Sequence, residues 1–397
     1  MSQSKSYVLI YTHSLYLKYS NDKSKYKLPL GEALFNILDE KDYKLFWLFR
    51  DKSKLYDFKK RKFFIPKLTK ILGLAVTIDN ILRILNYKLI IKTINKSFYI
   101  GILERLFWTC ILLFLKPKFI IGVEPSQELC YIARKLNIIS VDLEHGLRDD
   151  AYFFNKLYRY TENGYPDILL YSKKKDAKNL KKMIPKYTKN IESGYLDVIF
   201  HEKEIINEIK KRNNKKEILY AITYKVRGSD KPHPLPEEII KYILKTNIHL
   251  RIRIHPKLAQ NEDIFNKAIS HINLQLEEAG IENQSNKISY SNPFKISLWS
   301  DLVNANGMLT LNSSSYRYAH FLGLPVLVHS NEMNLYDFED HENNLFGFKD
   351  NVRNIECKKF VNKCAKNEKI NLNKFQELVK IEKQKMLTSI HIIEKQI

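Results

Sequence analysis

The stretch Leu250-Arg-Ile-Arg-Ile-His-Pro-Lys257 is the most informative part of the sequence for the fold, because aliphatic and basic residues alternate until a proline. A period of two places Arg251, Arg253 and His255 on one face of a strand and the aliphatic residues on the other. The proline ends the strand and fixes the backbone after His255. The stretch predicts a buried strand with a cationic tip to which Lys257 adds a charge, although a solvated edge strand would give the same alternation.

A second strand, Leu309-Thr-Leu-Asn-Ser-Ser-Ser315, runs directly into a hydroxyl-rich helix start. Backbone N–H groups and hydroxyls at a helix start can bind an anion, although plain N-capping explains one such residue without a ligand. Both tips lie at carboxyl ends of strands, where open α/β sheets hold their ligands. Together with the basic loop 224–229 they predict a phosphate or pyrophosphate site formed by Arg253, His255, Lys257, Asn312, Ser313, Ser314, Ser315, Lys225 and Arg227.

Apolar strands alternate with helical patterns along the whole chain, which predicts parallel strand pairing and doubly wound sheets. The 397 residues favour two domains. We expect a first domain over residues 1–200, a second over 201–370 that begins in the charged stretch 201–216, and a C-terminal helical segment over 371–397. Strands are expected at 7–12, 43–49, 119–123, 138–143, 168–171, 218–223, 250–254, 287–290, 308–311 and 326–328. Helices are expected at 30–38, 127–136, 236–245, 263–279, 315–322 and 373–393.

The first half has its own polar strand end in Val141-Asp-Leu-Glu-His-Gly-Leu-Arg148. A carboxylate or an imidazole there can act as a general base on an acceptor hydroxyl, and a structural pairing of the carboxylate with Arg148 is the alternative. A second carboxylate ends the strand at 119–123, and a histidine ends the first strand. The candidate residues on this side are Glu144, His145 and Glu124 as catalytic groups, with His13 and Arg148 facing the acceptor.

The formal charge of +22 has two explanations, a lysine-rich and asparagine-rich codon bias or attraction to an anionic partner. No nucleic-acid-binding motif is recognisable, so we expect no nucleic-acid partner. The four cysteines form no CxxC pair and no leader is apparent, which favours a cytoplasmic protein. The apolar stretch 98–115 is interrupted by Glu104 and Arg105, which favours a buried or interfacial helix over a membrane span.

Three motifs of common cofactor and metal sites do not occur in the sequence. There is no Walker A loop, no GxGxxG, and no DxD pattern that suggests a metal-binding loop. We therefore expect neither a cofactor nor an obligatory metal. Fixed cations and serine hydroxyls would then stabilise a leaving phosphate.

The motifs together resemble the GT-B glycosyltransferases of bacterial surface polysaccharide synthesis. Glu144-His-Gly146 resembles the (Q/W)HG element of capsule and teichoic-acid transferases, and Arg253-Ile-His-Pro256 is similar to their R-x-HP element. Asn312-Ser-Ser-Ser315 through Gly323-Leu-Pro-Val326 resembles the serine stretch of capsule synthesis proteins, including Kdo transferases. Tyr316-Arg317-Tyr318 replaces the usual Gly-x-Glu there, and Ser193-Gly-Tyr-Leu-Asp197 is a shortened form of the Gly-Tyr-Pro-x-x-Asp element.

The resemblance implies an α/β fold of the GT-B class, with two Rossmann-like domains facing across a cleft and a C-terminal helix crossing back to the N-terminal domain. It implies metal-independent transfer of a CMP-activated acidic sugar, such as a sialic-acid-like sugar or Kdo, to a hydroxyl of a capsule-type or lipopolysaccharide-type glycan or a lipid-linked acceptor. Peripheral association with the anionic inner face of the cell membrane fits that role. Three alternatives stay open, namely a polyol-phosphate transferase of the CDP-glycerol type, a nucleotide-sugar epimerase, and a non-catalytic binder of membranes or nucleic acid.

Overall fold

The computed structural model separates the chain into two compact units, residues Met1–His201 with Val379–Ile397, and residues Glu202–Leu378. The structure describes residues 6–12, 18–19, 26–27, 29–49, 66–90, 101–143, 164–172, 185–223, 231–281, 286–311, 313, 315–329, 345–348 and 355–397. We call the two parts the N-terminal unit and the C-terminal unit.

The N-terminal unit contains a six-stranded sheet in the order β4-β1-β5-β6-β7-β8, in which every pair of neighbours is parallel. Its strands are β1 (Tyr7–Thr12), β4 (Lys44–Phe49), β5 (Phe119–Val123), β6 (Ile139–Leu143), β7 (Ile168–Tyr171) and β8 (Lys189–Glu192). A short antiparallel pair, β2 (Lys18–Tyr19) and β3 (Tyr26–Lys27), lies outside this sheet. The chain steps from β1 to β4 on one side and then to β5 on the other, so the strand order reverses beside β1.

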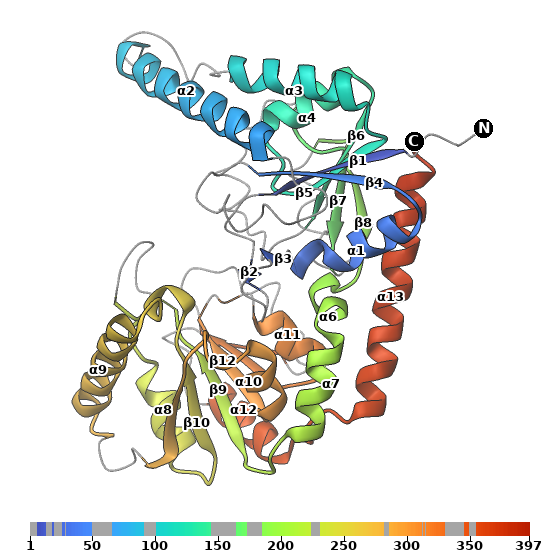
Figure 1. The fold of residues 1–397 in the computed structure, drawn as a ribbon. Helices are drawn as coiled ribbons and strands as arrows, with labels where there is room; N and C mark the ends of the chain where they lie inside the picture. The colour runs from blue at the N-terminus through green and yellow to red at the C-terminus, as the bar shows by residue number, and fades with distance from the viewer. Residues whose placement is uncertain are drawn as a thin grey trace. The chain divides into compact units, whose positions relative to one another are not determined.

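Helices cover both faces of this sheet (Figure 1). One face packs against α1 (Pro29–Glu40), α6 (Leu196–Phe200) and the C-terminal part of α13 (Leu372–Glu394). The other packs against α2 (Pro66–Ile90), α3 (Ile102–Leu115) and α4 (Gln127–Lys135). Alternate residues of β1 enter the two cores, because successive side chains of a strand point to opposite faces.

The C-terminal unit has a second parallel sheet, in the order β11-β10-β9-β12-β13-β14. Its strands are β9 (Glu217–Ala221), β10 (His249–Arg253), β11 (Ile288–Ser291), β12 (Gly307–Thr310), β13 (Val326–His329) and β14 (Leu345–Phe348). Numbered along the chain, this is the order 3-2-1-4-5-6 of a dinucleotide-binding sheet. Its helices are α7 (Glu202–Lys211), α8 (Glu237–Leu244), η3 (Pro256–Leu258), α9 (Glu262–Glu278), α10 (Leu298–Asn304), α11 (Tyr316–Phe321) and α12 (Ile355–Lys366).

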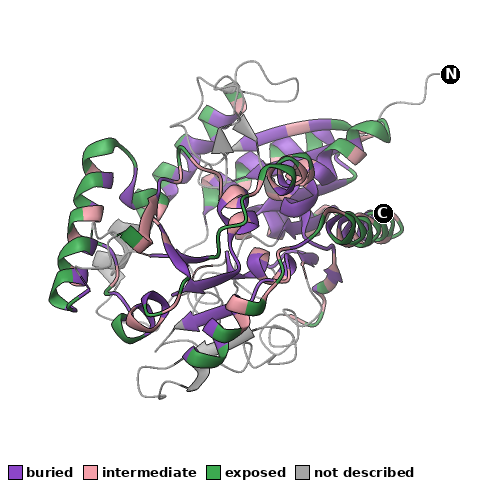
Figure 2. Ribbon diagram, turned by 90° about the horizontal axis from the view of Figure 1, so that it is seen from below, coloured by how far each residue is buried: buried purple, intermediate pink, exposed green. Residues whose placement is uncertain are grey.

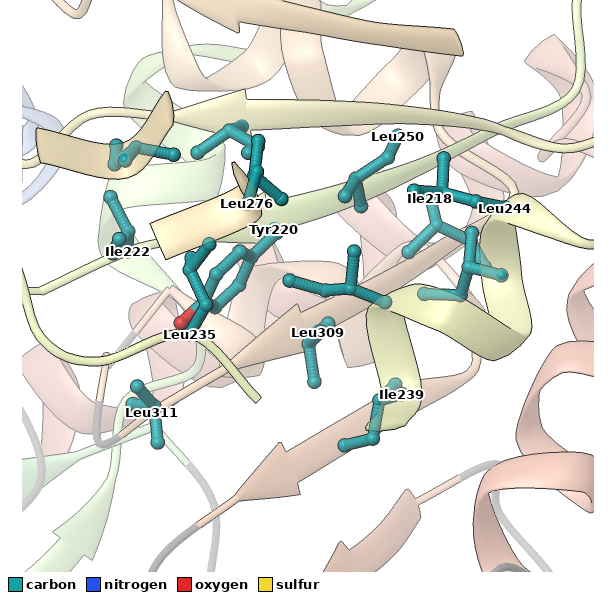
Figure 3. Packing of buried hydrophobic residues seen from close by; sticks show 14 of the residues in the cluster. Ile218, Tyr220, Ile222, Leu235, Ile239, Leu244, Leu250, Leu276, Leu309 and Leu311 are labelled. Carbon is teal, nitrogen blue, oxygen red and sulfur yellow. The ribbon is translucent and has the colours of Figure 1, made fainter. Parts of the chain in front are cut away.

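Aliphatic side chains fill the core between this sheet and helices α8, α9 and α12. Figure 3 shows Ile218 and Tyr220 of β9 beside Leu250 of β10 and Leu309 of β12, with Ile239 of α8 packed nearby. Near-continuous aliphatic strands are expected where a parallel sheet is covered on both faces. In Figure 2 the strands of both sheets are largely buried, and the exposed residues lie mainly on helices and loops.

The sequence located most of these elements, and the differences are as follows, with strand β8 also not expected. Strand β10 lies between β9 and β11, so it is an interior strand rather than a solvated edge. Strand β14 and helices α10 and α12 were not expected. The stretch interpreted as a passage between domains contains α7, a regular helix.

The C-terminal helix α13 is shared by the two units. Phe375, near its start, packs edge-on against Phe321 of the C-terminal unit, with ring centroids 6.5 Å apart. From Val379 onward the helix belongs to the N-terminal unit, where Met386, Ile390 and Ile393 enter the core. The returning segment therefore begins at Val379, later than the residue 371 expected from the sequence, because the first turns of the helix pack against the C-terminal unit.

A buried hydrogen bond and a partly exposed ion pair secure the returning part of α13 to β8 and the segment after it. The backbone N–H of Tyr195 donates to Glu382 Oε2 over 2.8 Å, and Lys385 Nζ lies 2.8 Å from Glu192. Gly194 has φ +74°, and a β-carbon at this position would lie 2.5 Å from Glu382 Oε2. The shortened Ser-Gly-Tyr element of the sequence is thus where the C-terminal helix attaches. In the part of the chain that the structure describes, no helix has the length and hydropathy needed to span a membrane.

Candidate functional site

Three strands of the C-terminal unit end at the same level. Arg253 of β10 and Thr310 of β12 both pair in register with Ala221, the last residue of β9. His255 follows two residues after Arg253, and Ser313 follows three residues after Thr310. Since β9 lies between the other two strands, their tips are about 10 Å apart across the sheet. This is also where the strand order reverses, the usual ligand position in such a sheet.

His255 stands just past β10 in a fixed orientation. Its Nδ1 accepts a hydrogen bond of 3.1 Å from the backbone N–H of Lys257, and the residue caps η3. Desolvation by burial, followed by the nearby Lys257 charge, lowers the pKa of His255 to about 4. The imidazole is therefore neutral at pH 7 with its proton on Nε2. The tip was expected to be cationic at this residue, whereas it carries a neutral N–H donor.

Arg253 is bound inside the C-terminal unit. Its Nη1 forms an ion pair with the fully buried carboxylate of Asp301 in α10 and donates to the backbone carbonyl of Ile296 over 3.0 Å. Ser291 Oγ, at the end of β11, donates to the same carboxylate over 2.6 Å. These contacts connect β10, β11 and α10. Arg253 therefore holds α10 against the ends of β10 and β11. Its assignment to donor binding stays a prediction.

The serine tip has its own internal geometry. Ser313 Oγ and Ser315 Oγ lie 2.7 Å apart, with either able to donate. Ser315 makes no side-chain hydrogen bond to the first turn of α11, so it does not act as an ordinary N-cap. The helix ends at Phe321, and Gly323, with φ +74°, follows it before β13. Two hydroxyls at this position can offer an O–H to an anion. Asn312 and Ser314 lie outside the described residues.

The basic loop after β9 begins and ends near this edge. The backbone N–H of His233 donates to the carbonyl of Thr223 over 2.8 Å, which brings the chain back to the tip of β9. Lys225 and Arg227 lie between these two positions but outside the described residues, so their predicted role at the anion remains a prediction.

The N-terminal unit has a comparable edge at the carboxyl ends of β1 and β5, which lie side by side. Thr12 pairs in register with Val123, and Glu124 comes next. Glu124 has φ +53°, which is rare for a residue with a side chain, and its backbone N–H donates to Asp142 Oδ1 over 2.9 Å. Thr12 Oγ1 accepts from Trp47 Nε1 over 2.9 Å. The hydrogen bond to Asp142 therefore helps to hold Glu124 in a strained backbone conformation at the reversal point.

The other candidates of this unit fall just beyond the described chain. The last described residue of β6 is Leu143, directly before Glu144. Asp142 of β6 pairs in register with Gly122 of β5. The strands that precede Glu124 and Glu144 in the sequence are thus neighbours in register. Glu144, His145 and Arg148 lie outside the described residues, as does His13, so their predicted catalytic and acceptor roles remain predictions.

The strained backbone at Glu124 leads to a prediction. Replacing Glu124 by glycine should raise the free energy of unfolding by about 1 kcal/mol, because glycine adopts a positive φ without a steric cost. If the carboxylate is catalytic, the same change should lower turnover strongly. Chemical denaturation and initial rates, measured on the same preparation, test both effects. Increased stability with full activity would remove Glu124 from the candidate bases.

The sequence analysis did not identify two carboxylates of the C-terminal unit that pair with the arginines of β10. Glu217, at the start of β9, accepts two hydrogen bonds from Arg251 of 3.1 and 3.2 Å, and Asp301 pairs with Arg253. Both partners are distant in sequence, so no local pattern joined them to the arginines. The only available signal was that two arginines in an interior strand require buried acids. Among the described residues, no group of three histidine, cysteine or acidic side chains is arranged to hold a metal ion.

Solved structures share this arrangement along nearly the whole chain. A UDP-N-acetylglucosamine 2-epimerase from Rickettsia bellii aligns with a TM-score of 0.56 and 13% identity, over 99% of this chain and 98% of its own. The UDP-GlcNAc 2-epimerase from Methanocaldococcus jannaschii aligns with a TM-score of 0.52 and 12% identity, over 92% and 94%. The glycotransferase of kitacinnamycin aligns with a TM-score of 0.51 and 9% identity, over 99% and 100%.

The likeness concerns the fold, since the sequences share so few identical residues. A scan against models of protein families gives no match, and a search of the curated proteins gives none. The chain has two Rossmann-like domains of the GT-B type, with a C-terminal helix that crosses back to the N-terminal unit, as the sequence predicted.

Proposed function

We propose that the protein is a glycosyltransferase that takes its sugar from a nucleotide donor, whose phosphate binds at the carboxyl edge of the C-terminal sheet. The observation that carries the proposal is the geometry of two tips beside β9. On one side stands His255, whose Nδ1 accepts from the Lys257 N–H so that Nε2 carries the proton, and the hydroxyls of Ser313 and Ser315 stand on the other. Both flank the reversal point of a sheet with the strand order of dinucleotide-binding folds.

In the proposed reaction, a carboxylate or imidazole of the N-terminal unit removes the proton of an acceptor hydroxyl. Glu124, Glu144 and His145 are the candidates for this base. The acceptor oxygen then attacks the anomeric carbon, and the bond from that carbon to the phosphate oxygen breaks. Negative charge develops on the departing nucleotide, where the His255 N–H, Lys257 and the serine hydroxyls would stabilise it. No metal is required for these steps.

The finer assignment is the donor. The Arg-x-His-Pro and Asn-Ser-Ser elements favour a CMP-activated acidic sugar, and a UDP-sugar is the main alternative. A glycan or lipid-linked hydroxyl of capsule or lipopolysaccharide type would then be the acceptor. A polyol-phosphate transferase would release CMP but give a glycerol-phosphate product instead of a glycoside, so product analysis separates the two.

An epimerase is the second candidate, and a specific observation favours considering it. Two of the solved structures that align along the chain are described as UDP-GlcNAc 2-epimerases. An epimerase needs no acceptor, whereas a transferase needs one. Incubation with UDP-GlcNAc alone, followed by separation of the sugar nucleotides, should leave the substrate unchanged if the protein is a transferase. Appearance of an isomer would establish the epimerase instead.

The His255 donor gives a direct test of the phosphate site. One of CMP, CDP, UDP and GDP should raise the melting temperature, and His255→Ala should weaken binding of that nucleotide by about 10–100-fold. His255→Gln retains an amide N–H close to the position of Nε2 and should keep part of the affinity. His255→Asn keeps the acceptor for the Lys257 N–H but has no N–H at the position of Nε2, so it should behave like alanine. Equal shifts for all four proteins would contradict the assignment of His255 to the phosphate site.

A further inference from the structure

Helices α2 and α3 expose a row of large apolar side chains on the outside of the N-terminal unit. We call these residues the α2–α3 surface. Phe114 is 84% exposed, and Ile102 and Leu106 are 59% and 57% exposed. The full set is Ile71, Leu74, Ile78, Ile81 and Leu82 of α2 with Ile102, Leu106, Leu113 and Phe114 of α3. Single exposed apolar residues are ordinary, but a cluster on adjacent helices indicates an interaction site.

The spacing puts each set on a single helical face. In α2 the residues recur at intervals of three and four, and in α3 they lie four, eleven and twelve positions after Ile102, which is the period of one helical face. The opposite faces are occupied, since Leu72 and Val76 of α2 and Trp108 and Leu112 of α3 enter the core over the sheet. The apolar residues of the α2–α3 surface are therefore additional to those that fold the unit.

The two helices are fixed to each other by a buried acid. Asp79 of α2 is 3% exposed and accepts hydrogen bonds from the backbone N–H groups of Leu103 and Glu104, of 3.3 and 2.8 Å, at the start of α3. Figure 1 shows α2 and α3 side by side, on the side of the unit where they cover the sheet. The two apolar faces thus belong to helices that are joined to each other by hydrogen bonds.

The exposed charged positions described in α2 and at the end of α3 have a single sign. Within residues 67–82 of α2 and along α3, the only acids are Asp79 and Glu104, and both are buried. The exposed charged positions at the ends of these segments are Lys67 and Lys70 in α2 and Lys116 directly after α3. Lysine beside leucine, isoleucine and phenylalanine is the composition of helices that lie in the interface of an anionic membrane.

We propose that the α2–α3 surface binds the surface of an anionic lipid bilayer, with Phe114 and its aliphatic neighbours in the headgroup boundary and the lysines at the lipid phosphates. A bilayer fits this surface better than a protein partner, because its exposed core is apolar and the described charged positions at its ends are lysines, whereas protein interfaces have polar rims that pair groups of both signs. The proposal assigns the peripheral membrane association expected from the sequence to a particular surface, and its test does not depend on the transferase activity.

The chain offers a probe for this proposal without any substitution. Cys110 is exposed on α3, at the spacing that places it beside Leu106 and Phe114, while the other three cysteines of the chain are buried. A bimane fluorophore attached to Cys110 should shift its emission to the blue on addition of vesicles of phosphatidylglycerol and phosphatidylcholine. Lipids that carry a nitroxide quencher in the acyl chain should quench it. No shift and no quenching would overturn the proposal.

Vesicle flotation of the full chain then separates apolar from electrostatic contributions. Phe114→Glu should lower the fraction bound to anionic vesicles at least about tenfold. The matched control is Phe294→Glu, which changes a phenylalanine that is 65% exposed in the C-terminal unit and should bind as the unaltered protein does. Lys67→Glu with Lys70→Glu should reduce binding to anionic vesicles by about tenfold or more, and high salt should do the same.

Three results would contradict the lipid assignment. Equal losses for Phe114→Glu and Phe294→Glu would mean that the α2–α3 surface is not the contact. Equal binding to neutral and anionic vesicles would remove the role of the lysines. A dimer in sedimentation velocity that Phe114→Glu converts to a monomer, without vesicle binding by either protein, would assign the surface to a second copy of the chain. Circular dichroism of each variant establishes that the fold is retained.

Discussion

Asp301→Ala is expected to lower the free energy of unfolding of the C-terminal unit by about 3–5 kcal/mol. The Asp301 side chain is fully buried, pairs with Arg253, lies 3.6 Å from Arg251 and accepts from Ser291. Its removal leaves a guanidinium that is only 11% exposed without its carboxylate, and such a charge cannot recover its hydration inside the unit. Urea unfolding followed by tryptophan fluorescence measures the change.

A matched control distinguishes the buried pair from ion pairs in general. Glu262 pairs with Lys295 in the same unit, but the two side chains are 59% and 66% exposed. Glu262→Ala should therefore change the stability by less than about 1 kcal/mol. Asp301→Asn, which keeps the shape and one acceptor oxygen, should fall between the two. If Asp301→Ala were no more destabilising than Glu262→Ala, the ion pair with Arg253 would not be a structural element of this edge.

Gly194→Ala is expected to lower the stability of the N-terminal unit by roughly 2–4 kcal/mol. One part of the loss comes from φ +74°, which a residue with a β-carbon adopts at a cost. The other comes from contact, because the new β-carbon would lie 2.5 Å from Glu382 Oε2 and 3.0 Å from the Glu382 carbonyl oxygen. The carboxylate that receives the Tyr195 N–H must then move, and hydrogen exchange in α13 after Val379 should accelerate.

Gly280 provides the control that separates these two costs. Its φ is +70°, and a β-carbon there would have no neighbour within 4 Å. Gly280→Ala should therefore show only the backbone cost of roughly 1–2 kcal/mol, with no change of exchange in α13. Equal destabilisation by the two substitutions would mean that close packing against Glu382 does not fix the position of the C-terminal helix.

Much of the fold followed from local patterns in the sequence. The boundaries of β1, β5 and β7 agree with the expected ones to the residue, because each is a short buried run bounded by turn residues. Strand β8 was missed because its sequence, Lys-Asn-Ile-Glu, has a single apolar residue. Only one of its four positions is buried. Helix α10 was missed because seven residues give too little periodicity to detect.

The residue types of the candidate site could be predicted from the sequence. The protonation state of His255 and the partner of Arg253 could not. The sequence identified His255 and the serines as strand ends, which depends only on where an apolar run stops. It could not predict that burial and Lys257 would keep the imidazole neutral. Nor could it predict that Arg253 would be paired with Asp301, since that contact requires a helix 48 positions away to pack beside β10.

The sequence by itself determined most of the strands and helices and the carboxyl ends that carry polar residues. These depend on the periods of the helix and the strand, which act within a few residues. Tertiary structure alone decided that β10 is an interior strand, that β9 stands between the His255 and Ser313 tips, and that Glu382 reaches the Tyr195 N–H. The physical reason is that burial and pairing depend on groups far apart in the chain, which only the packed molecule brings together.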